Sequence, residues 1–551
     1  MQSARRLLPF SKIPKTLERP RLAVAVTAIG SGALAACGFQ PLSLWPFTLL
    51  AVALLFELVV RTRTGQGAFL IGWYFGIGHF TLGNNWIATA FTYQANIPPW
   101  LGGIAVFLLS LYLAVFPALA TLAAWFLVRP DRARAPFAAL VLALGSTWIV
   151  TEWIRAWLFT GFSWNPLGIA LLGQFQTRGL ALITPWTGTY GLSGLLVLLA
   201  GLPGLCIRTG MRFSGAKRWI WALPALTAAA ALATLMTVPD PWVRREEGAV
   251  HFTLVQPDLR QEIIDDPRWY EANFLKLARL SLPRHPGEKR VVFWPESGLG
   301  DYIRDGYPYY LYRLYTYGAD PAIARARIGR VIGPYSLLLT GSVDLVMKDG
   351  DAVAARNSVT AIDGRGDILA GYSKAHLVPF GEYLPVRWLL APLGAARFVA
   401  GDLDFRPGPG PQTYDFGSWG KAGIQICYEI IFSGKVTDPL NRPDYIYNPS
   451  NDGWFGSWGP PQHLAQARLR AIEEGVPVLR STTTGISAVI DADGIVRHSI
   501  PLHTAGRIDG RIPPPHAPTL FARYGNALPL ALAALLGLCA VSMVAFSRRR
   551  R

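Results

Sequence analysis

Repeated apolar stretches of about 20 residues constrain this chain more than any other feature of its sequence. A helix that crosses a hydrocarbon core of roughly 30 Å needs about 20 apolar residues. The chain of 551 residues is 51% hydrophobic and only 16% charged, whereas soluble domains carry roughly 25% charged residues. We therefore predict a polytopic α-helical membrane protein with about eight spans, at residues 22–38, 42–60, 67–91, 99–128, 135–150, 187–207, 220–238 and 527–546.

Basic residues lie in alternate connections between these predicted spans. The formal net charge of +17 is concentrated outside residues 240–520, whose own charge is nearly balanced. The first and third connections, near Gln40 and Tyr93, are uncharged. Because Lys and Arg mark cytoplasmic connections, we expect both termini in the cytoplasm and residues 240–520 outside it. The basic positions are the first 21 residues, 61–63, 129–134, 208–218 and 548–551. This distribution is not the basic face of a nucleic-acid-binding protein, and no nucleic-acid partner is expected.

Residues 156–177 are also uncharged and would reverse this topology if they crossed the membrane. They contain Gly161, Asn165, Pro166 and Gly168 among aromatic residues. Irregular backbone at membrane depth is tolerated only where protein or water covers it. We therefore expect an interfacial or re-entrant segment here rather than a span.

Residues 240–520 are long enough to fold around a core of their own. Helical periodicity is found at 270–282 and 463–474, and Asp-Gly pairs at 363–364 and 493–494 indicate hairpin turns. We predict a layered α/β domain with a mixed sheet. It would follow a membrane domain at 1–239 and precede a last span with a basic tail at 521–551. The expected strands are 250–255, 290–294, 336–343, 358–362, 423–427, 444–448, 476–482 and 487–490.

Three polar residues lie at or near the ends of predicted strands, where α/β proteins place their functional groups. Glu296 can accept a proton as a general base, Cys427 can act as a nucleophile, and Lys374 can stabilise a negative oxygen. Together they predict acyl transfer through a thioester. A Cys–His pair with His376 or His463 as the base is the alternative. The four cysteines form no disulfide framework and no zinc-ligand spacing, so no metal site is expected.

The residues around this set resemble the carbon–nitrogen hydrolase (nitrilase) superfamily, and within it the bacterial apolipoprotein N-acyltransferases. The motif at 374–383, KAHLVPFGEY, carries most of the resemblance. The runs CYE at 427–429, NPSNDGWF at 448–455, EWIR at 152–155 and TGF at 160–162 are similar as well. The resemblance covers nearly the whole chain and implies an extracytoplasmic domain with an αββα sandwich.

The resemblance also implies roles for individual residues. Glu296, Lys374 and Cys427 would form the catalytic triad, as general base, oxyanion stabiliser and nucleophile. Glu382 would support the triad, and the remaining implied site residues are Tyr428, Glu429, Trp454 and Phe455. One loop departs from the family pattern, with Asp258 where Asn is common and Trp269 as the nearest replacement for a tryptophan. No cofactor is implied.

The implied reaction moves a fatty acyl chain from a phospholipid, typically phosphatidylethanolamine, to Cys427. The N-terminal amine of a diacylglyceryl-cysteine apolipoprotein then takes the chain as an amide, which completes bacterial lipoprotein maturation. The implied location is the bacterial inner membrane, with the catalytic domain in the periplasm. One alternative is a membrane-tethered amidase or nitrilase that hydrolyses small amides. A transporter with an accessory domain is disfavoured, because the predicted spans contain few ionisable residues and no inverted repeat.

Overall fold

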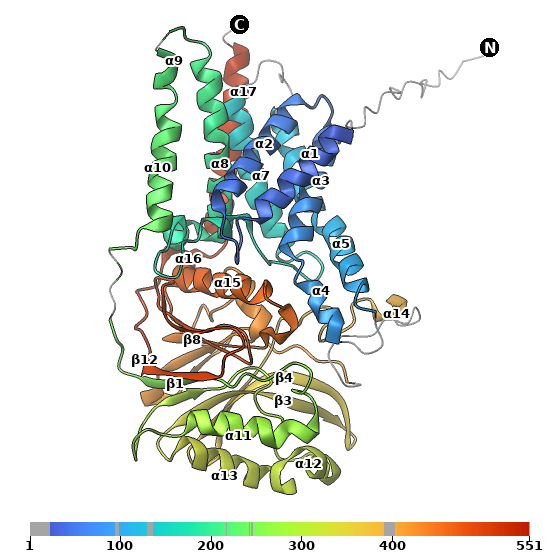
Figure 1. Cartoon of the computed structure of the whole chain (residues 1–551), viewed down its shortest axis with the longest axis vertical. Helices are drawn as coiled ribbons and strands as arrows, with labels where there is room; N and C mark the ends of the chain where they lie inside the picture. The colour runs from blue at the N-terminus through green and yellow to red at the C-terminus, as the bar shows by residue number, and fades with distance from the viewer. Residues whose placement is uncertain are drawn as a thin grey trace, which may run out of the picture.

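A bundle of apolar helices lies above a two-sheet α/β domain in the computed structural model (Figure 1). The structure describes residues 22–93, 98–128, 136–215, 217–241, 243, 246–390 and 403–549. The basic positions expected at 1–21, 129–134 and 550–551 lie outside these residues. The helices of the bundle are α1 (Leu22–Ala36), α2 (Trp45–Arg61), α3 (Gly65–Gly83), α4 (Ile87–Ala90), α5 (Leu101–Leu113), α6 (Val115–Val128), α7 (Phe137–Arg155), α8 (Thr184–Gly210), α9 (Lys217–Ile220), α10 (Leu223–Thr237), α16 (Leu520–Tyr524) and α17 (Ala527–Arg549).

Several of these helices fit a membrane-spanning part. Among the described residues, five helical stretches are long and apolar enough to cross a bilayer, and α1 is a shorter apolar helix. This count neither confirms nor contradicts the prediction of about eight spans. The five stretches are Leu101–Val128, Phe137–Arg155, Leu180–Gly210, Lys217–Thr237 and Ala527–Ser547.

Two predicted spans have an interruption that the apolar pattern did not reveal. In the stretch predicted at 67–91, helix α3 ends at Gly83 and the short helix α4 begins at Ile87. The stretch predicted at 99–128 is divided between α5 and α6 at Ala114. Pro117 has no N–H to donate to the carbonyl four residues earlier, so it favours a break one turn before it.

Residues 156–177 contain no helix long enough to cross a membrane, which agrees with the expectation of a non-spanning segment. The segment holds one short 3-10 helix, η3 (Leu167–Leu171), whose residues are all buried. Arg155 at the end of α7 donates to the Trp164 carbonyl at 2.9 Å, and Glu152 accepts from the Leu167 N–H at 2.8 Å. The pair Glu152–Arg155 therefore holds the irregular backbone of this segment in place.

The α/β domain contains two six-stranded sheets with the same pattern of pairing. The first has the order β12-β1-β2-β3-β4-β5 and the second β11-β10-β9-β8-β7-β6. In each sheet two parallel pairs join three of the four inner strands, β1-β2-β3 in the first and β7-β8-β9 in the second, and the remaining pairs are antiparallel. The strands are β1 (His251–Gln256), β2 (Val291–Phe293), β3 (Leu337–Lys348), β4 (Asp351–Asp363), β5 (Ile368–Ser373), β6 (Thr413–Asp415), β7 (Lys421–Ile424), β8 (Tyr445–Ser450), β9 (Val478–Thr482), β10 (Ser487–Ile490), β11 (Val496–Ile500) and β12 (Gly506–Arg511).

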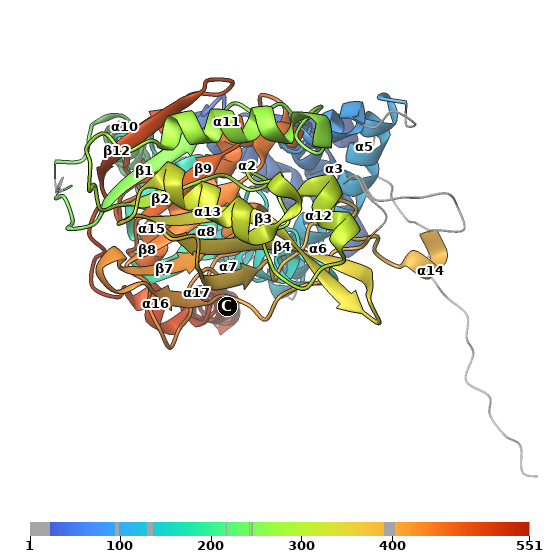
Figure 2. The same cartoon turned by 90° about the horizontal axis from the view of Figure 1, so that it is seen from below.

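The core lies between the two sheets because alternate side chains of a strand face opposite sides. Val291 and Phe293 of β2 face Ile424 and Tyr447 of the second sheet. Val292, between them, packs on the other side against helices α11 (Tyr270–Ser281) and α13 (Pro321–Ile332). Figure 2 shows these two helices and α12 (Tyr309–Tyr315) across the first sheet, with the membrane helices behind.

Helix α15 (Gly459–Glu474) forms the layer between the second sheet and the membrane helices (Figure 1). Leu464, Ala467 and Ala471 pack with the outer face of the second sheet. Leu469 and Ile472 pack with the core of the helical bundle. The order of layers is therefore helices, sheet, sheet, α15 and membrane helices, with α15 buried on both sides.

Candidate active site

Strand ends bring the three predicted catalytic residues to one edge of the α/β domain. Glu296 lies just after β2, Lys374 directly after β5, and Cys427 three residues after β7. Cys427 begins the 3-10 helix η9 (Cys427–Ile431) with φ of +50°. A residue with a Cβ adopts this left-handed conformation at a cost of roughly 1–2 kcal/mol, so the surrounding contacts must hold it there.

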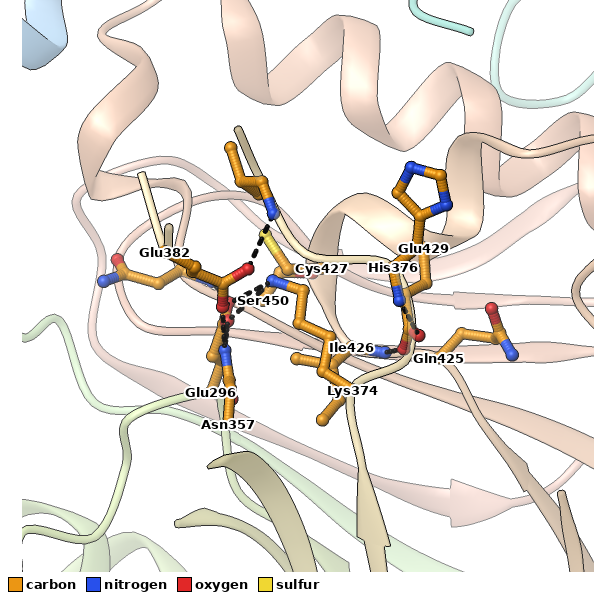
Figure 3. A network of polar contacts seen from close by, with 12 residues as sticks. Glu296, Asn357, Lys374, His376, Glu382, Gln425, Ile426, Cys427, Glu429 and Ser450 are labelled. Carbon is orange, nitrogen blue, oxygen red and sulfur yellow. Dashed lines mark hydrogen bonds and ion pairs between the residues drawn. The ribbon is translucent and has the colours of Figure 1, made fainter. Parts of the chain in front are cut away.

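Lys374 lies between two carboxylates (Figure 3). Its Nζ is 3.0 Å from Oε1 of Glu382 and 3.5 Å from Oε1 of Glu296. Asn357 of β4 donates to both carboxylates at 2.7 Å and so joins them. Burial lowers the pKa of Lys374, but Glu382 and then Glu296 raise it, and the net result is a pKa above the ordinary lysine value. The ammonium form is therefore present at neutral pH.

Backbone N–H groups fix the second oxygen of each carboxylate. Asn451 donates its N–H to Oε2 of Glu296 at 2.8 Å, and Val378 donates its N–H to Oε2 of Glu382 at 2.8 Å. Glu296 is 6% exposed and Glu382 is 5% exposed. Both carboxylates are thus held on two sides, with little room to rotate.

The Cys427 sulfur lies beside the Lys374 ammonium and the carboxylates (Figure 3). The residue is 5% exposed. Burial, followed by the charge of Glu296, raises the pKa of the Cys427 thiol well above its ordinary value, and Lys374 opposes this effect. The protonated thiol is thus the resting form, so a base must take its proton when it reacts.

Glu429 connects the loop that carries the thiol to the loop that carries the lysine. Its Oε2 accepts from the Ile426 N–H at 2.8 Å, and its Oε1 accepts from the N–H groups of Ala375 at 2.7 Å and His376 at 3.1 Å. The Tyr372 hydroxyl donates to the same Oε1 at 2.8 Å. Burial raises the pKa of Glu429 to about 7, and these donors oppose that rise. A change of this residue would disturb both loops together.

The other predicted residues lie between the site and the membrane helices. Tyr428 is buried and its hydroxyl donates to the Gly161 carbonyl at 3.3 Å. The Phe455 ring lies 4.6 Å from that of Trp86, and the Trp454 ring lies 5.7 Å from that of Tyr93, between ring centroids. The loop that follows β8 is therefore covered by aromatic side chains from the helical part.

The two histidines of the alternative Cys–His pair both contact backbone carbonyls. His376 Nε2 is 2.9 Å from the Thr160 oxygen, and His463 Nε2 is 3.0 Å from the Cys427 oxygen. Burial lowers the pKa of His376 to about 4. This arrangement favours Glu296 over either histidine as the base for the thiol.

The residues that join the site together were not found by sequence reasoning. Asn357 lies within the long strand β4, and no motif marks it. Gln261 lies in the loop in which the sequence departs from the family pattern. Its side-chain oxygen accepts a hydrogen bond from Asn451 Nδ2 at 2.8 Å. Trp269 of that loop is 45% exposed, and Asp258 accepts from the Thr484 hydroxyl at 2.6 Å.

No group of three or more His, Cys, Asp or Glu side chains is placed to hold a metal ion within the described part of the chain. The polar groups around Cys427 instead combine its thiol with the Lys374 ammonium and the carboxylates of Glu296 and Glu382. Such a set can activate a nucleophile and stabilise an oxyanion.

Comparison with known proteins matches two separate parts of the chain to two families. Residues 31–202 match the family described as the apolipoprotein N-acyltransferase N-terminal domain, and residues 271–515 match the carbon-nitrogen hydrolase family. The apolipoprotein N-acyltransferase of Rhodopseudomonas palustris is 34% identical over 96% of this chain and 95% of its own length. That of Bradyrhizobium diazoefficiens is 35% identical over 94% of both chains. Among solved structures, a mutant nitrilase-superfamily amidase from Nesterenkonia AN1 is similar at 18% identity, covering 53% of this chain and 95% of its own, with a TM-score of 0.33.

Proposed function

The chain belongs to the apolipoprotein N-acyltransferase family, and from this premise we propose that it acylates the N-terminal amine of lipoproteins through a thioester on Cys427. The similarity over nearly the full length of named relatives supports the reaction. The contacts among Lys374, Glu296 and Glu382 support the assignment of residues. We propose phosphatidylethanolamine as the acyl donor and a diacylglyceryl-cysteine apolipoprotein as the acceptor.

In the first half-reaction, Glu296 takes the proton of the Cys427 thiol. The sulfur attacks the ester carbonyl carbon of the donor, and the oxygen of the tetrahedral intermediate becomes negative. The Lys374 ammonium stabilises this oxygen, together with the Tyr428 backbone N–H. When the intermediate collapses, the lysophospholipid alkoxide leaves and takes the proton from Glu296.

In the second half-reaction, the neutral amine of the lipoprotein attacks the thioester carbon. Glu296 takes a proton from the attacking nitrogen, and the same donors stabilise the second oxyanion. The amide forms as the C–S bond breaks, and the proton returns to the sulfur. Cys427 is only 5% exposed, so substrates must displace part of the surrounding loops to reach the sulfur.

The charge pattern supports a location in the bacterial inner membrane with the catalytic domain in the periplasm. Arg61 and Arg208 lie at the ends of α2 and α8 that are remote from the sheets. Lipid and lipoprotein substrates are both anchored in a bilayer, so the site needs to face its surface. We propose a membrane domain at 1–239, a catalytic domain at 240–520 and a C-terminal span with a cytoplasmic tail at 521–551.

The observation that most strongly supports this proposal is the buried cluster of Lys374, Glu296 and Glu382 beside Cys427 (Figure 3). The test is incubation of the purified protein in detergent with phosphatidylethanolamine labelled in its acyl chains. We expect one labelled acyl-enzyme per chain, sensitive to hydroxylamine and absent from Cys427→Ala, with Cys539→Ala as the matched control. An equal hydroxylamine-sensitive label on Cys427→Ala would refute the thioester.

A membrane-tethered amidase would use the same triad and is less supported by the similarity to named relatives. The fate of the acyl group separates the two reactions. When a diacylated lipopeptide is added to the acyl-enzyme, transfer gives a labelled amide, whereas hydrolysis gives free fatty acid at a rate that the lipopeptide does not change.

A further inference from the structure

A buried polar cluster lies behind Cys427 and takes no part in the reaction described above. His463 and Arg480 are fully buried, and Asp452 is 2% exposed. Arg480 Nη2 donates to both oxygens of Asp452, at 2.8 and 2.6 Å, and lies 3.0 Å from His463 Nδ1. A charged cluster is costly to bury, so its position against the nucleophile needs an explanation.

The cluster reaches the nucleophile through its backbone. His463 Nε2 is 3.0 Å from the carbonyl oxygen of Cys427, and Asn448 Nδ2 is 3.5 Å from the same oxygen. A carbonyl oxygen can only accept, so the proton of the imidazole ring lies on Nε2. His463 therefore donates to the peptide group that follows the reactive thiol.

Asp452 and Arg480 both hold the other side of the ring, because His463 Nδ1 lies 3.0 Å from Asp452 Oδ1 and 3.0 Å from Arg480 Nη2. Burial and then the charge of Arg480 lower the pKa of His463, whereas Asp452 opposes them. In the neutral ring Nδ1 accepts from Arg480, and in the protonated ring it donates to Asp452 Oδ1; in both states Nε2 carries the proton that the Cys427 carbonyl accepts. Arg480 Nη1 also donates to Asn448 Oδ1 at 2.6 Å, which turns the Asn448 amide N–H groups toward the Cys427 loop.

The direction of this carbonyl determines the direction of an N–H group needed in catalysis. The Cys427 carbonyl and the Tyr428 N–H belong to one planar peptide unit and point to opposite sides when the bond is trans. The Tyr428 N–H lies in the first turn of η9, where a helix leaves N–H groups without partners of its own. A carbonyl held by His463 thus leaves the N–H directed away from the cluster.

We propose that His463 is a positioning residue, which holds the Cys427 carbonyl and so aims the Tyr428 N–H at the oxyanion of the acyl-transfer intermediate. Asp452 and Arg480 orient the His463 ring for this task. The role rests on the proposed function, and it differs from that of Glu296, because His463 acts on the oxyanion donor and not on the thiol proton.

The experiment compares His463→Gln with His463→Met, two side chains of similar length of which only glutamine carries an N–H donor. His498→Gln, at an exposed position of β11, is the matched control. Two rates are measured on the full-length protein in detergent. One is the rate of acyl-enzyme formation at increasing phosphatidylethanolamine concentration, and the other is the rate of Cys427 alkylation by iodoacetamide, followed by peptide mass spectrometry.

We expect His463→Met to lower the maximal rate of acyl-enzyme formation by about 10- to 100-fold, somewhat less than complete loss of an oxyanion donor. The half-saturating lipid concentration should change by less than about two-fold, since ground-state binding is not involved. His463→Gln should recover most of the lost rate. Alkylation involves no oxyanion and should proceed at about the wild-type rate in both variants.

Three outcomes would overturn the proposal. Equal rates for the Gln and Met variants would show that the donor is not needed. A parallel loss of alkylation would assign His463 to the thiol itself, and failure of both variants to fold would assign it to stability. If the wild-type protein forms no acyl-enzyme at all, the proposed function fails, and this result is distinct from the other three.

Discussion

Glu382 supplies the nearer of the two negative charges around Lys374, and Glu382→Gln removes it with little change in shape. At 3.0 Å and an effective dielectric constant of ~20, the attraction between the two charges is ~5.5 kcal/mol. The corresponding attraction to Glu296 at 3.5 Å is ~4.7 kcal/mol. The substitution thus removes about half of the attraction that offsets the burial of the ammonium.

The net effect is smaller, because glutamine keeps one oxygen for Lys374 and Asn357. Loss of one partner of a buried ion pair typically costs about 3–5 kcal/mol. Glu382 raises the pKa of Lys374 and burial lowers it, so the substitution lowers this pKa. Since 1.36 kcal/mol corresponds to one pH unit, the alkaline limit of activity should move down by about two to four pH units.

The assay is the rate of acyl-enzyme formation between pH 6 and pH 10. In the wild-type protein the raised pKa keeps Lys374 charged below the ordinary lysine value of ~10.4, so the rate should show no alkaline loss from this group. Because the pKa of Lys374 is raised in the folded protein, the charged ammonium also stabilises the fold. That stability is lost only as the pH rises through the folded-state pKa of Lys374. Glu382→Gln should lose activity on the alkaline side first. A uniform loss at every pH would refute the electrostatic role and leave Glu382 as a structural residue.

Two further predictions test the layer between the site and the membrane helices. Replacement of both Trp454 and Phe455 with Ser should raise the ratio of free fatty acid to amide product, because these rings help to exclude water from the thioester; an unchanged ratio would contradict this role. Glu473→Gln should lower the midpoint of thermal unfolding in detergent by several degrees, because it leaves the charge of Arg470, 2.7 Å away, without its buried partner, at a cost of about 3–5 kcal/mol. An unchanged midpoint would contradict the importance of this contact.

The sequence predicted the strands that carry the site better than the contacts that complete it. Short runs rich in β-branched residues mark the strands before Glu296 and Cys427, and polar residues at their ends are easy to recognise. Asn357 could not be recognised, because its role depends on the antiparallel pairing of β4 with β3 and β5, which brings it beside Glu296 after β2 and Glu382 after β5. Contacts that depend on which strands pair leave no periodic signal in any single strand.

Helix α15 illustrates a second limit of sequence reasoning. Its apolar periodicity predicted a helix at 463–474, and the structure has one at Gly459–Glu474. The same pattern did not reveal that both faces are buried, because the second face meets the membrane part partly through polar side chains. Gln462 accepts from Trp164 and Asn165 at 2.8 and 2.9 Å, and polar residues of this kind suggest a solvent-exposed face when the sequence is read alone.

Helix α15 therefore contacts both the membrane helices and the backbone of Cys427. Glu473 accepts from the Thr189 N–H of α8 at 2.5 Å, and His463 near the start of the same helix donates to the Cys427 carbonyl. A helix is stiff over this distance, so displacement of α15 by the membrane helices would also displace the nucleophile. This layer is fixed by the membrane part, which gives a physical reason for the two parts to act as one enzyme.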